Sequence, residues 1–180
     1  MTQYVAFLRA VNVGGNNVKK ERLVELFEEV GLEGVETFIA SGNVRFCSGE
    51  TDVDELEARI EAHMVEALGW QADTFVRSME HLAGLLEGRP WADEEPAKGE
   101  TLSVLFAHRP FTKQERAALK ALETPTDRFE AQGREMYWFC RTRMSDSTVK
   151  PSAMAKAAGQ PTTSRNLNTI RRLVDKYGSA

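Results

Sequence analysis

The 180-residue sequence has little cysteine, no excess of basic residues and no long apolar run. Its two cysteines, Cys47 and Cys140, are too few and too far apart for a disulfide framework or a zinc site, so we expect no metal site and a reducing, cytoplasmic location. The net charge is −4, whereas proteins that bind a nucleic-acid backbone usually carry a basic excess. No stretch is long and apolar enough to cross a bilayer, and the first residues lack the layout of a signal peptide. These absences argue against a membrane protein, a disulfide-stabilised secreted protein and a nucleic-acid binder.

The first half of the chain predicts alternating strands and helices. Apolar periodicity and end signals give these elements in order: a strand over 3–10, a helix ending at Gly31, strands over 35–40 and 44–47, a helix capped by Asp52, a strand over 71–77, and a short trailing helix. The turn between the second and third strands is predicted at Ser41-Gly42-Asn43, because Gly-Asn pairs adopt the positive φ angles of a tight hairpin. This order is the β-α-β-β-α-β unit of ferredoxin-like folds.

The second half repeats the pattern. The predicted elements are a strand over 101–107, a helix with a capping box at Thr112 and Glu115, a hairpin of 127–131 and 135–141, a helix from Pro151 to Gly159, and a last helix beginning near Ser164. Only residues 159–163 are left for a fourth strand, which must then be very short.

The predicted fold class is therefore α+β, with two ferredoxin-like units in tandem. We place the first unit at residues 1–88, a polar linker marked by Pro and Gly at 89–99, and the second unit at 100–180. A shared motif favours an internal duplication: F-x-A-x-G begins at Phe38 and again at Phe129, and each copy is followed by a Phe-Cys pair.

Two long segments resemble a known family. Residues 4–15, YVAFLRAVNVGG, and residues 35–46, VETFIASGNVRF, resemble the "FLRGINVGG" and "TYIQSGNVVF" motifs of domain-of-unknown-function family 1697. Residues 162–169, TTSRNLNT, are similar to its "TTRNWNT" segment. The sequence departs from the pattern at Ala10, Ala40, Ser164 and Leu167, and the Ala40 and Leu167 changes bear on any ligand contact inferred from the family. The resemblance implies paired ferredoxin-like units and no function, because the family's activity is not established.

The loop after the first strand is the first candidate site. In a β-α-β-β-α-β unit this loop and the turn between the second and third strands leave the same end of the sheet, and the loop also precedes the first helix, whose N-terminus favours anions. The candidate binding residues are Arg9, Asn12, Gly14, Gly15, Asn16, Lys19, Ser41, Gly42 and Asn43. Ordinary turn and capping chemistry explains the same residues, and the loop matches neither of the established glycine-rich phosphate motifs.

Arg165 and Asn166 form a second polar cluster, predicted at the start of the last helix. An arginine there can bind a carboxylate or phosphate through two hydrogen bonds, although helix capping beside a solvated arginine explains it equally.

Two functions follow from these residues, and a third stays open. The first is a binding module for a small anionic, phosphate- or nucleotide-like metabolite at the Gly14-Gly15 loop. The second is nucleic-acid binding through the sheet, which requires exposed aromatic residues such as Phe7 and Phe46. The third is an enzyme, for which the sequence offers no nucleophile, acid–base pair or cofactor motif to name. Catalytic residues, cofactors and oligomeric state therefore remain without a prediction.

Overall fold

The computed structural model describes residues 1–178, apart from the side chain of Ser41. It divides into two compact units. Unit 1 comprises Met1–Ala83 and Leu173–Ala180, and unit 2 comprises Gly84–Arg172. The divisions after Ala83 and after Arg172 each fall inside a helix, so each of these two helices contributes residues to both units. This division does not test the linker predicted at residues 89–99, which stays a prediction.

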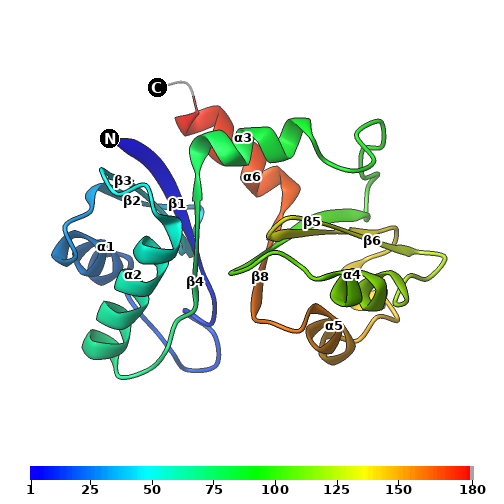
Figure 1. Cartoon of the computed structure of the whole chain (residues 1–180), viewed down its shortest axis with the longest axis horizontal. Helices are drawn as coiled ribbons and strands as arrows, with labels where there is room; N and C mark the ends of the chain where they lie inside the picture. Colours follow the sequence, from blue (N-terminus) through cyan, green and yellow to red (C-terminus); the bar gives the residue numbers. More distant parts are fainter. Residues whose placement is uncertain (179–180) are drawn as a thin grey trace. The chain divides into compact units, whose positions relative to one another are not determined.

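Unit 1 contains a four-stranded antiparallel sheet, here called sheet A, with strand order β2-β3-β1-β4. Its elements are β1 (Thr2–Leu8), α1 (Lys20–Glu29), β2 (Glu33–Phe38), β3 (Ala40–Ser48), α2 (Val53–Leu68) and β4 (Thr74–Ser78), followed by α3 (Met79–Glu87). Figure 1 shows α1 and α2 together on one face of this sheet. The core between them contains Ala6, Val44 and Phe46 from the strands and Leu23 and Ile60 from the helices.

Unit 2 repeats this topology in sheet B, an antiparallel sheet with strand order β6-β7-β5-β8. Its elements are β5 (Thr101–Ala107), α4 (Lys113–Lys120), β6 (Asp127–Gln132), β7 (Glu135–Cys140), the 3-10 turn η1 (Met144–Asp146), α5 (Pro151–Ala158) and β8 (Thr162–Asn166), followed by α6 (Leu167–Tyr177). Helices α4 and α5 cover one face of sheet B (Figure 1). The predicted fold class, two β-α-β-β-α-β units in an α+β chain, is confirmed.

Local end signals explain where several helices start and stop. The Asp52 side chain accepts hydrogen bonds from the N–H groups of Asp54 and Glu55 at the start of α2. Thr112 and Glu115 form a reciprocal capping box at the start of α4. These caps were predicted correctly because they depend on residues within one turn of each other.

The predicted turn of the first hairpin is wrong. The chain turns at Ile39, whose φ is 60°, and Ser41, Gly42 and Asn43 lie within β3. The register between β2 and β3 shifts between Thr37 and Phe38, which moves the turn toward the N-terminus. Asn43 is buried, and its side-chain amide donates to the Phe38 carbonyl at 3.1 Å. The Gly-Asn pair therefore braces the hairpin from inside a strand.

The predicted start of the last helix is also wrong. Ser164, Arg165 and Asn166 belong to β8, which pairs antiparallel with β5, and α6 begins at Leu167. Pairing with β5 satisfies the backbone hydrogen-bonding groups of this segment, which overrides its weak helical signal.

The repeated Phe-Cys pair does not mark equivalent positions. In unit 1 Phe46 faces the helices, whereas in unit 2 Cys140 faces them and Phe139 packs against Trp91. Because side chains alternate between the two faces of a strand, this one-residue offset places the two motifs in opposite registers. The repetition of the units thus lies in their topology, and the short motif gives no support for duplication.

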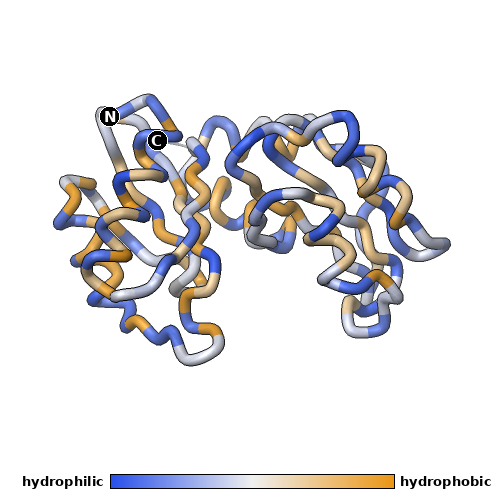
Figure 2. Tube along the Cα trace, turned by 60° about the horizontal axis from the view of Figure 1, so that its bottom comes forward, coloured by the Kyte–Doolittle hydropathy of each residue, from blue (hydrophilic) through white to orange (hydrophobic). Residues whose placement is uncertain are grey.

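Among the described residues, no helix is long and apolar enough to span a membrane. Hydropathy along the trace changes over short stretches, as an alternation of buried and solvent-facing positions requires (Figure 2).

Candidate anion-binding site

The loop after β1 and the turn after β2 lie at the same end of sheet A. In the register of the sheet, Phe7 of β1 is opposite Asn43 of β3, and Leu8 is opposite Thr74 of β4. Loop residues 9–19 therefore leave the sheet next to the start of β3, as the topology predicted.

Four residues of this loop have positive φ angles. Ala10 and Asn12 have φ values of 63° and 57°, and Gly14 and Gly15 have 64° and 97°. Positive φ is costly for a residue with a side chain and persists where the surroundings hold it. The Asn12 N–H donates to the Asn16 carbonyl at 2.7 Å, and the Asn12 side-chain oxygen accepts from the Val18 N–H at 2.8 Å. The loop is thus a cross-braced turn that leads directly into α1.

Helix α1 begins with two lysines where a capping side chain is usual. Lys19 is the N-cap residue in extended conformation, and in the described structure it makes no side-chain capping hydrogen bond. Lys20 is the first helical residue, and Glu21 is the acidic residue of the first turn. The first N–H groups of a helix have no intrahelical partner, and the positive end of the helix dipole disfavours cations. Exposed Lys19 and Lys20 therefore add positive potential at a terminus that already attracts anions.

Two predicted members of the site, Arg9 and Asn43, make contacts that hold sheet A together. Arg9 forms an ion pair with Asp73 at 2.9 Å, and its N–H donates to the Asp73 carbonyl, which ties β1 to the start of β4. Asn43 is committed to the hairpin through Phe38. Gly42 lies in β3 beside it, and the side chain of Ser41 lies outside the described part of the structure.

Arg165 and Asn166 belong to unit 2 and are described with it. Arg165 is partly buried on β8, where it donates to the Thr163 hydroxyl and the Ser164 carbonyl, both at 2.8 Å. Burial lowers the pKa of the Arg165 guanidinium to about 10. The Asn166 side chain accepts from the Asn168 N–H at 2.9 Å and so caps α6. Within unit 1 the candidate site consists of the loop and the start of α1.

The comparisons with known proteins show a family. The model of the DUF1697 family, described as a protein of unknown function, matches residues 1–137. The chain belongs to this family. A solved structure of the conserved bacterial protein SP0830 from Streptococcus pneumoniae is similar over 99% of both chains, with a TM-score of 0.76 and 23% identity. At this identity the similarity shows the fold alone. A search of curated proteins gives no match.

In this DUF1697 chain, the aromatic residues considered for nucleic-acid stacking are buried. Phe46 lies in the core between sheet A and its helices, and Phe7 is 0% exposed. Stacking on a base requires an accessible ring face. Sheet A therefore does not present these two rings to a nucleic acid.

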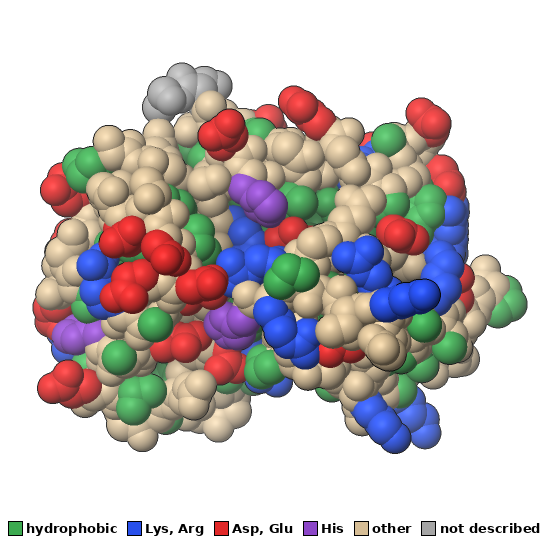
Figure 3. Space-filling view, viewed as in Figure 1, with side chains coloured by type: hydrophobic (Ala, Val, Ile, Leu, Met, Phe, Trp, Pro, Cys, Tyr) green, Lys and Arg blue, Asp and Glu red, His purple; other side chains and the backbone are tan. Residues whose placement is uncertain are grey.

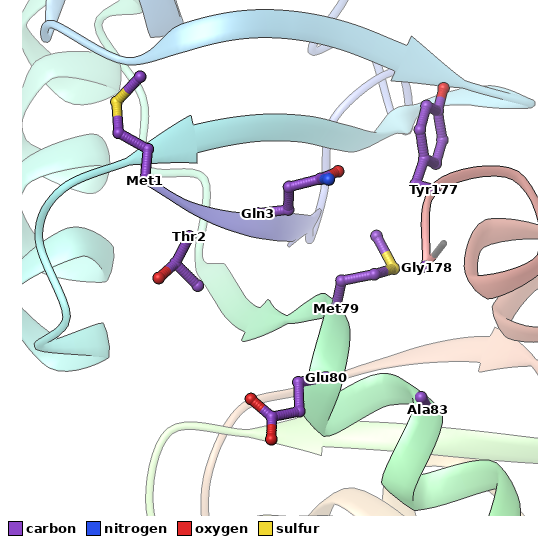
Figure 4. Close-up of a pocket in the computed structure, with 8 residues that line it drawn as sticks. All are labelled: Met1, Thr2, Gln3, Met79, Glu80, Ala83, Tyr177 and Gly178. Atoms are coloured by element: carbon purple, nitrogen blue, oxygen red, sulfur yellow. The ribbon is translucent and has the colours of Figure 1, made fainter. Parts of the chain in front are cut away.

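A cavity in unit 1 escaped the sequence analysis. It has a volume of about 410 Å³, and its lining residues are Met1, Thr2, Gln3, Met79, Glu80, Ala83, Tyr177 and Gly178 (Figure 4). Gln3 lies near the start of β1, at the other end of the strand from the loop at 9–19, and its side-chain oxygen accepts two hydrogen bonds from Arg45. The lining comes from three separate parts of the sequence, so no local motif could have indicated it.

Proposed function

We propose that this protein binds a small anionic metabolite with a phosphate or similar group at the Gly14-Gly15 loop and the N-terminus of α1. The observation that carries the proposal is the start of α1, where Lys19 and Lys20 replace a capping side chain after a braced turn of positive φ. An anion there would accept hydrogen bonds from the first-turn N–H groups, which have no intrahelical partner, and would offset both lysine charges.

The residues would have different roles. Lys19 and Lys20 would supply charge, and the glycines would let an anion approach the backbone because they carry no side chain. A Cβ on Gly15 would meet nothing within 4 Å, so the space above the loop is open. Asn12 would hold the loop through Val18, and Asn43 would hold the hairpin beside it. Arg9 would act through its ion pair with Asp73.

Two further observations bear on the proposal. The burial of Phe7 and Phe46 favours a metabolite over a nucleic acid at sheet A. The free thiols of Cys47 and Cys140 support a cytoplasmic location, where such metabolites are abundant.

The experiment is a thermal-unfolding titration with inorganic phosphate and AMP at constant ionic strength. We expect both to raise the melting temperature of the parent protein, and the Lys19→Ala/Lys20→Ala variant to lose this shift. The matched control is Lys150→Ala, because Lys150 is the N-cap residue of α5, also makes no side-chain cap in the described structure, and follows no glycine loop. A shift that survives in the double variant, or that Lys150→Ala removes equally, would contradict the proposal.

A further inference from the structure

Charge is divided unequally between the two units. Unit 1 contains 8 Lys and Arg against 16 Asp and Glu, a net charge of −8, whereas unit 2 contains 15 against 11, a net charge of +4. The total charge of −4 is therefore the sum of an acidic unit 1 and a basic unit 2. In the space-filling view, Lys and Arg side chains gather over unit 2, on the right (Figure 3).

Two arginines of unit 2 converge on one carboxylate. Arg128 of β6 donates to Glu94 Oε1 at 2.8 Å, and Arg141, just after β7, donates to Glu94 Oε2. Each guanidinium also lies against an aromatic ring. The Arg128 Cζ is 4.5 Å from the centre of the Trp91 ring, and the Arg141 Cζ is 4.2 Å from that of Phe139. Stacking on the rings fixes the guanidinium planes, which prepares them to bind an oxyanion.

The carboxylate belongs to a short acidic segment. Residues 91–95, Trp-Ala-Asp-Glu-Glu, are called here the acidic strap. Its second glutamate, Glu95, accepts from Arg171 of α6 at 2.6 Å. The Arg128 guanidinium holds the pKa of Glu94 below its ordinary value, and Arg171 does the same for Glu95. Glu95 also accepts from buried Arg89, so the two adjacent negative charges of the strap lie on four arginines, of which Arg128, Arg141 and Arg171 are partly exposed.

The strap is anchored at one end and strained. Arg89 is buried and donates to the carbonyls of Trp91, Ala92 and Glu94, which curls the chain around its guanidinium. Trp91 has a φ of 55°, in the left-handed region that a bulky side chain rarely occupies. Strained backbone of this kind persists only where other contacts hold it, and it concentrates at ligand clamps and switch regions. The contacts that hold the strap include the ion pairs of Glu94 and Glu95.

We propose that Arg128, Arg141 and Arg171 form a binding site for a diphosphate group, and that Glu94 and Glu95 occupy this site until the ligand displaces them. Two linked phosphoryl groups carry at least the negative charge of two consecutive carboxylates and offer more acceptor oxygens, and arginine pairs with phosphate through two hydrogen bonds as it does with carboxylate. Release of Glu94 and Glu95 would relieve the backbone strain at Trp91, while the hydrogen bonds of Arg89 keep the start of the strap attached. This site is independent of the loop proposed in unit 1.

The test measures pyrophosphate binding to the full chain by calorimetry at fixed ionic strength. Glu94→Gln/Glu95→Gln removes the competing charges at nearly constant shape, and we expect it to bind pyrophosphate at least tenfold more tightly than the parent. The control Glu87→Gln/Asp146→Asn makes the same charge change at exposed positions of unit 2 and should leave the affinity nearly unchanged. Adding Arg128→Ala/Arg141→Ala to the first variant should abolish its gain, whereas adding Lys19→Ala/Lys20→Ala should not. ADP in place of pyrophosphate distinguishes a nucleoside ligand from a free diphosphate.

Trp91 supplies a second readout in the parent chain. Displacement of the strap would move the indole from Arg128, so pyrophosphate should change the tryptophan fluorescence of the parent and not that of Trp91→Phe, which keeps Trp70 and Trp138. This measurement does not depend on the folding of a multiple variant. The proposal is wrong if the two charge variants bind pyrophosphate equally, or if binding survives the loss of Arg128 and Arg141.

Discussion

Lys176 Nζ lies 2.6 Å from Glu36 Oε1 and joins the end of α6 to the edge strand β2 within unit 1. The next residue, Tyr177, packs edge-on against Phe38 with ring centroids 5.7 Å apart, and Arg45 lies over the tyrosine ring. Residues 140 positions apart in sequence thus complete the surface of sheet A that faces away from α1 and α2. Unit 2 has similar contacts, in which Arg128 of β6 lies over the Trp91 ring and Arg141 lies over the Phe139 ring.

The first prediction concerns this contact. Tyr177→Ala should lower the free energy of unfolding by about 2 kcal/mol, because it removes both a partly buried ring and an aromatic pair. Tyr177→Phe keeps the ring and should cost less than about 0.5 kcal/mol, and Lys176→Ala should cost less than Tyr177→Ala because its ion pair is half exposed. Urea unfolding measures all three. Equal losses for Tyr177→Phe and Tyr177→Ala would show that the ring contact contributes little.

The second prediction concerns a buried carboxylate in unit 2. Asp127 is 0% exposed and accepts hydrogen bonds from the hydroxyls of Thr124, Thr126 and Ser147 and from the Trp138 indole, at 2.7 to 3.0 Å. Asp127→Asn replaces one acceptor oxygen by a donor that faces these groups. We expect it to cost about 3 kcal/mol, since hydrogen bonds to a charged group contribute about 1.5–3 kcal/mol each and an unsatisfied donor adds to the loss. The exposed Asp146→Asn is the control.

The same residue should make stability depend on pH. Burial raises the pKa of Asp127, but its four hydrogen bonds outweigh burial and leave the pKa below its ordinary value. A folded-state pKa below the unfolded value of about 3.9 means that this stabilisation is complete above that pH and is lost as pH falls through the folded pKa. Unfolding measured between pH 5 and pH 2 should therefore show a shallower acid decline for Asp127→Asn than for the parent. An unchanged decline would show that other carboxylates determine it.

The third prediction compares two helix-ending glycines. Gly69 and Gly159 have φ values of 77° and 66°, but a Cβ would meet nothing within 4 Å at Gly69 and would clash with the Glu115 carboxylate at Gly159. Gly69→Ala should cost about 1 kcal/mol from backbone strain alone. Gly159→Ala should cost about 1–2 kcal/mol more, because overpacking adds to the strain.

A double-variant cycle separates these contributions. In a Glu115→Ala background the crowding at Gly159 is gone, so Gly159→Ala should then cost about as much as Gly69→Ala. If the extra cost persists without Glu115, crowding by that carboxylate is not its cause.

The elements that the sequence predicts well depend on neighbours within a few residues. The caps at Asp52 and Thr112 and the helix end at Gly159 were placed correctly for this reason. The β2–β3 turn was misplaced because the shift at Thr37 and the brace from Asn43 to Phe38 depend on pairing between strands. Tertiary pairing overrides local turn propensity at such a place.

The candidate sites show the same limit. The loop at Gly14-Gly15 and the start of α1 could be located from the sequence, because both are local features of one segment. Glu94 and Arg128 are 34 residues apart, and Glu94 and Arg141 are 47 apart, so only the fold of unit 2 shows that they meet. The total charge gave no sign of the basic unit, since it averages over both halves.

The last prediction concerns β4, the last strand in the order of sheet A. β4 is an edge strand, and two carboxylates of α2 accept its N–H groups: Glu57 accepts from Val76 at 2.8 Å and Glu61 from Thr74 at 2.7 Å. Glu57 is buried and also pairs with buried Arg77 at 3.3 Å. An edge strand with free N–H groups can pair with another chain, so we expect both carboxylates to hinder such pairing as well as to stabilise the fold.

Removing one partner of a buried pair leaves an uncompensated charge, so Glu57→Ala should cost about 3–5 kcal/mol. Glu61→Ala should cost about 1 kcal/mol, because its hydrogen bond with the Thr74 N–H is only partly buried. Urea unfolding gives both free-energy losses. Light scattering after partial unfolding tests whether the two carboxylates hinder association through β4. In that test, Glu57→Ala should aggregate faster than a Glu61→Ala sample adjusted to the same unfolded fraction. Similar small losses of unfolding free energy for both variants would mean that Arg77 finds another partner when Glu57 is absent. Similar scattering would mean that the carboxylates stabilise β4 without preventing association at its edge.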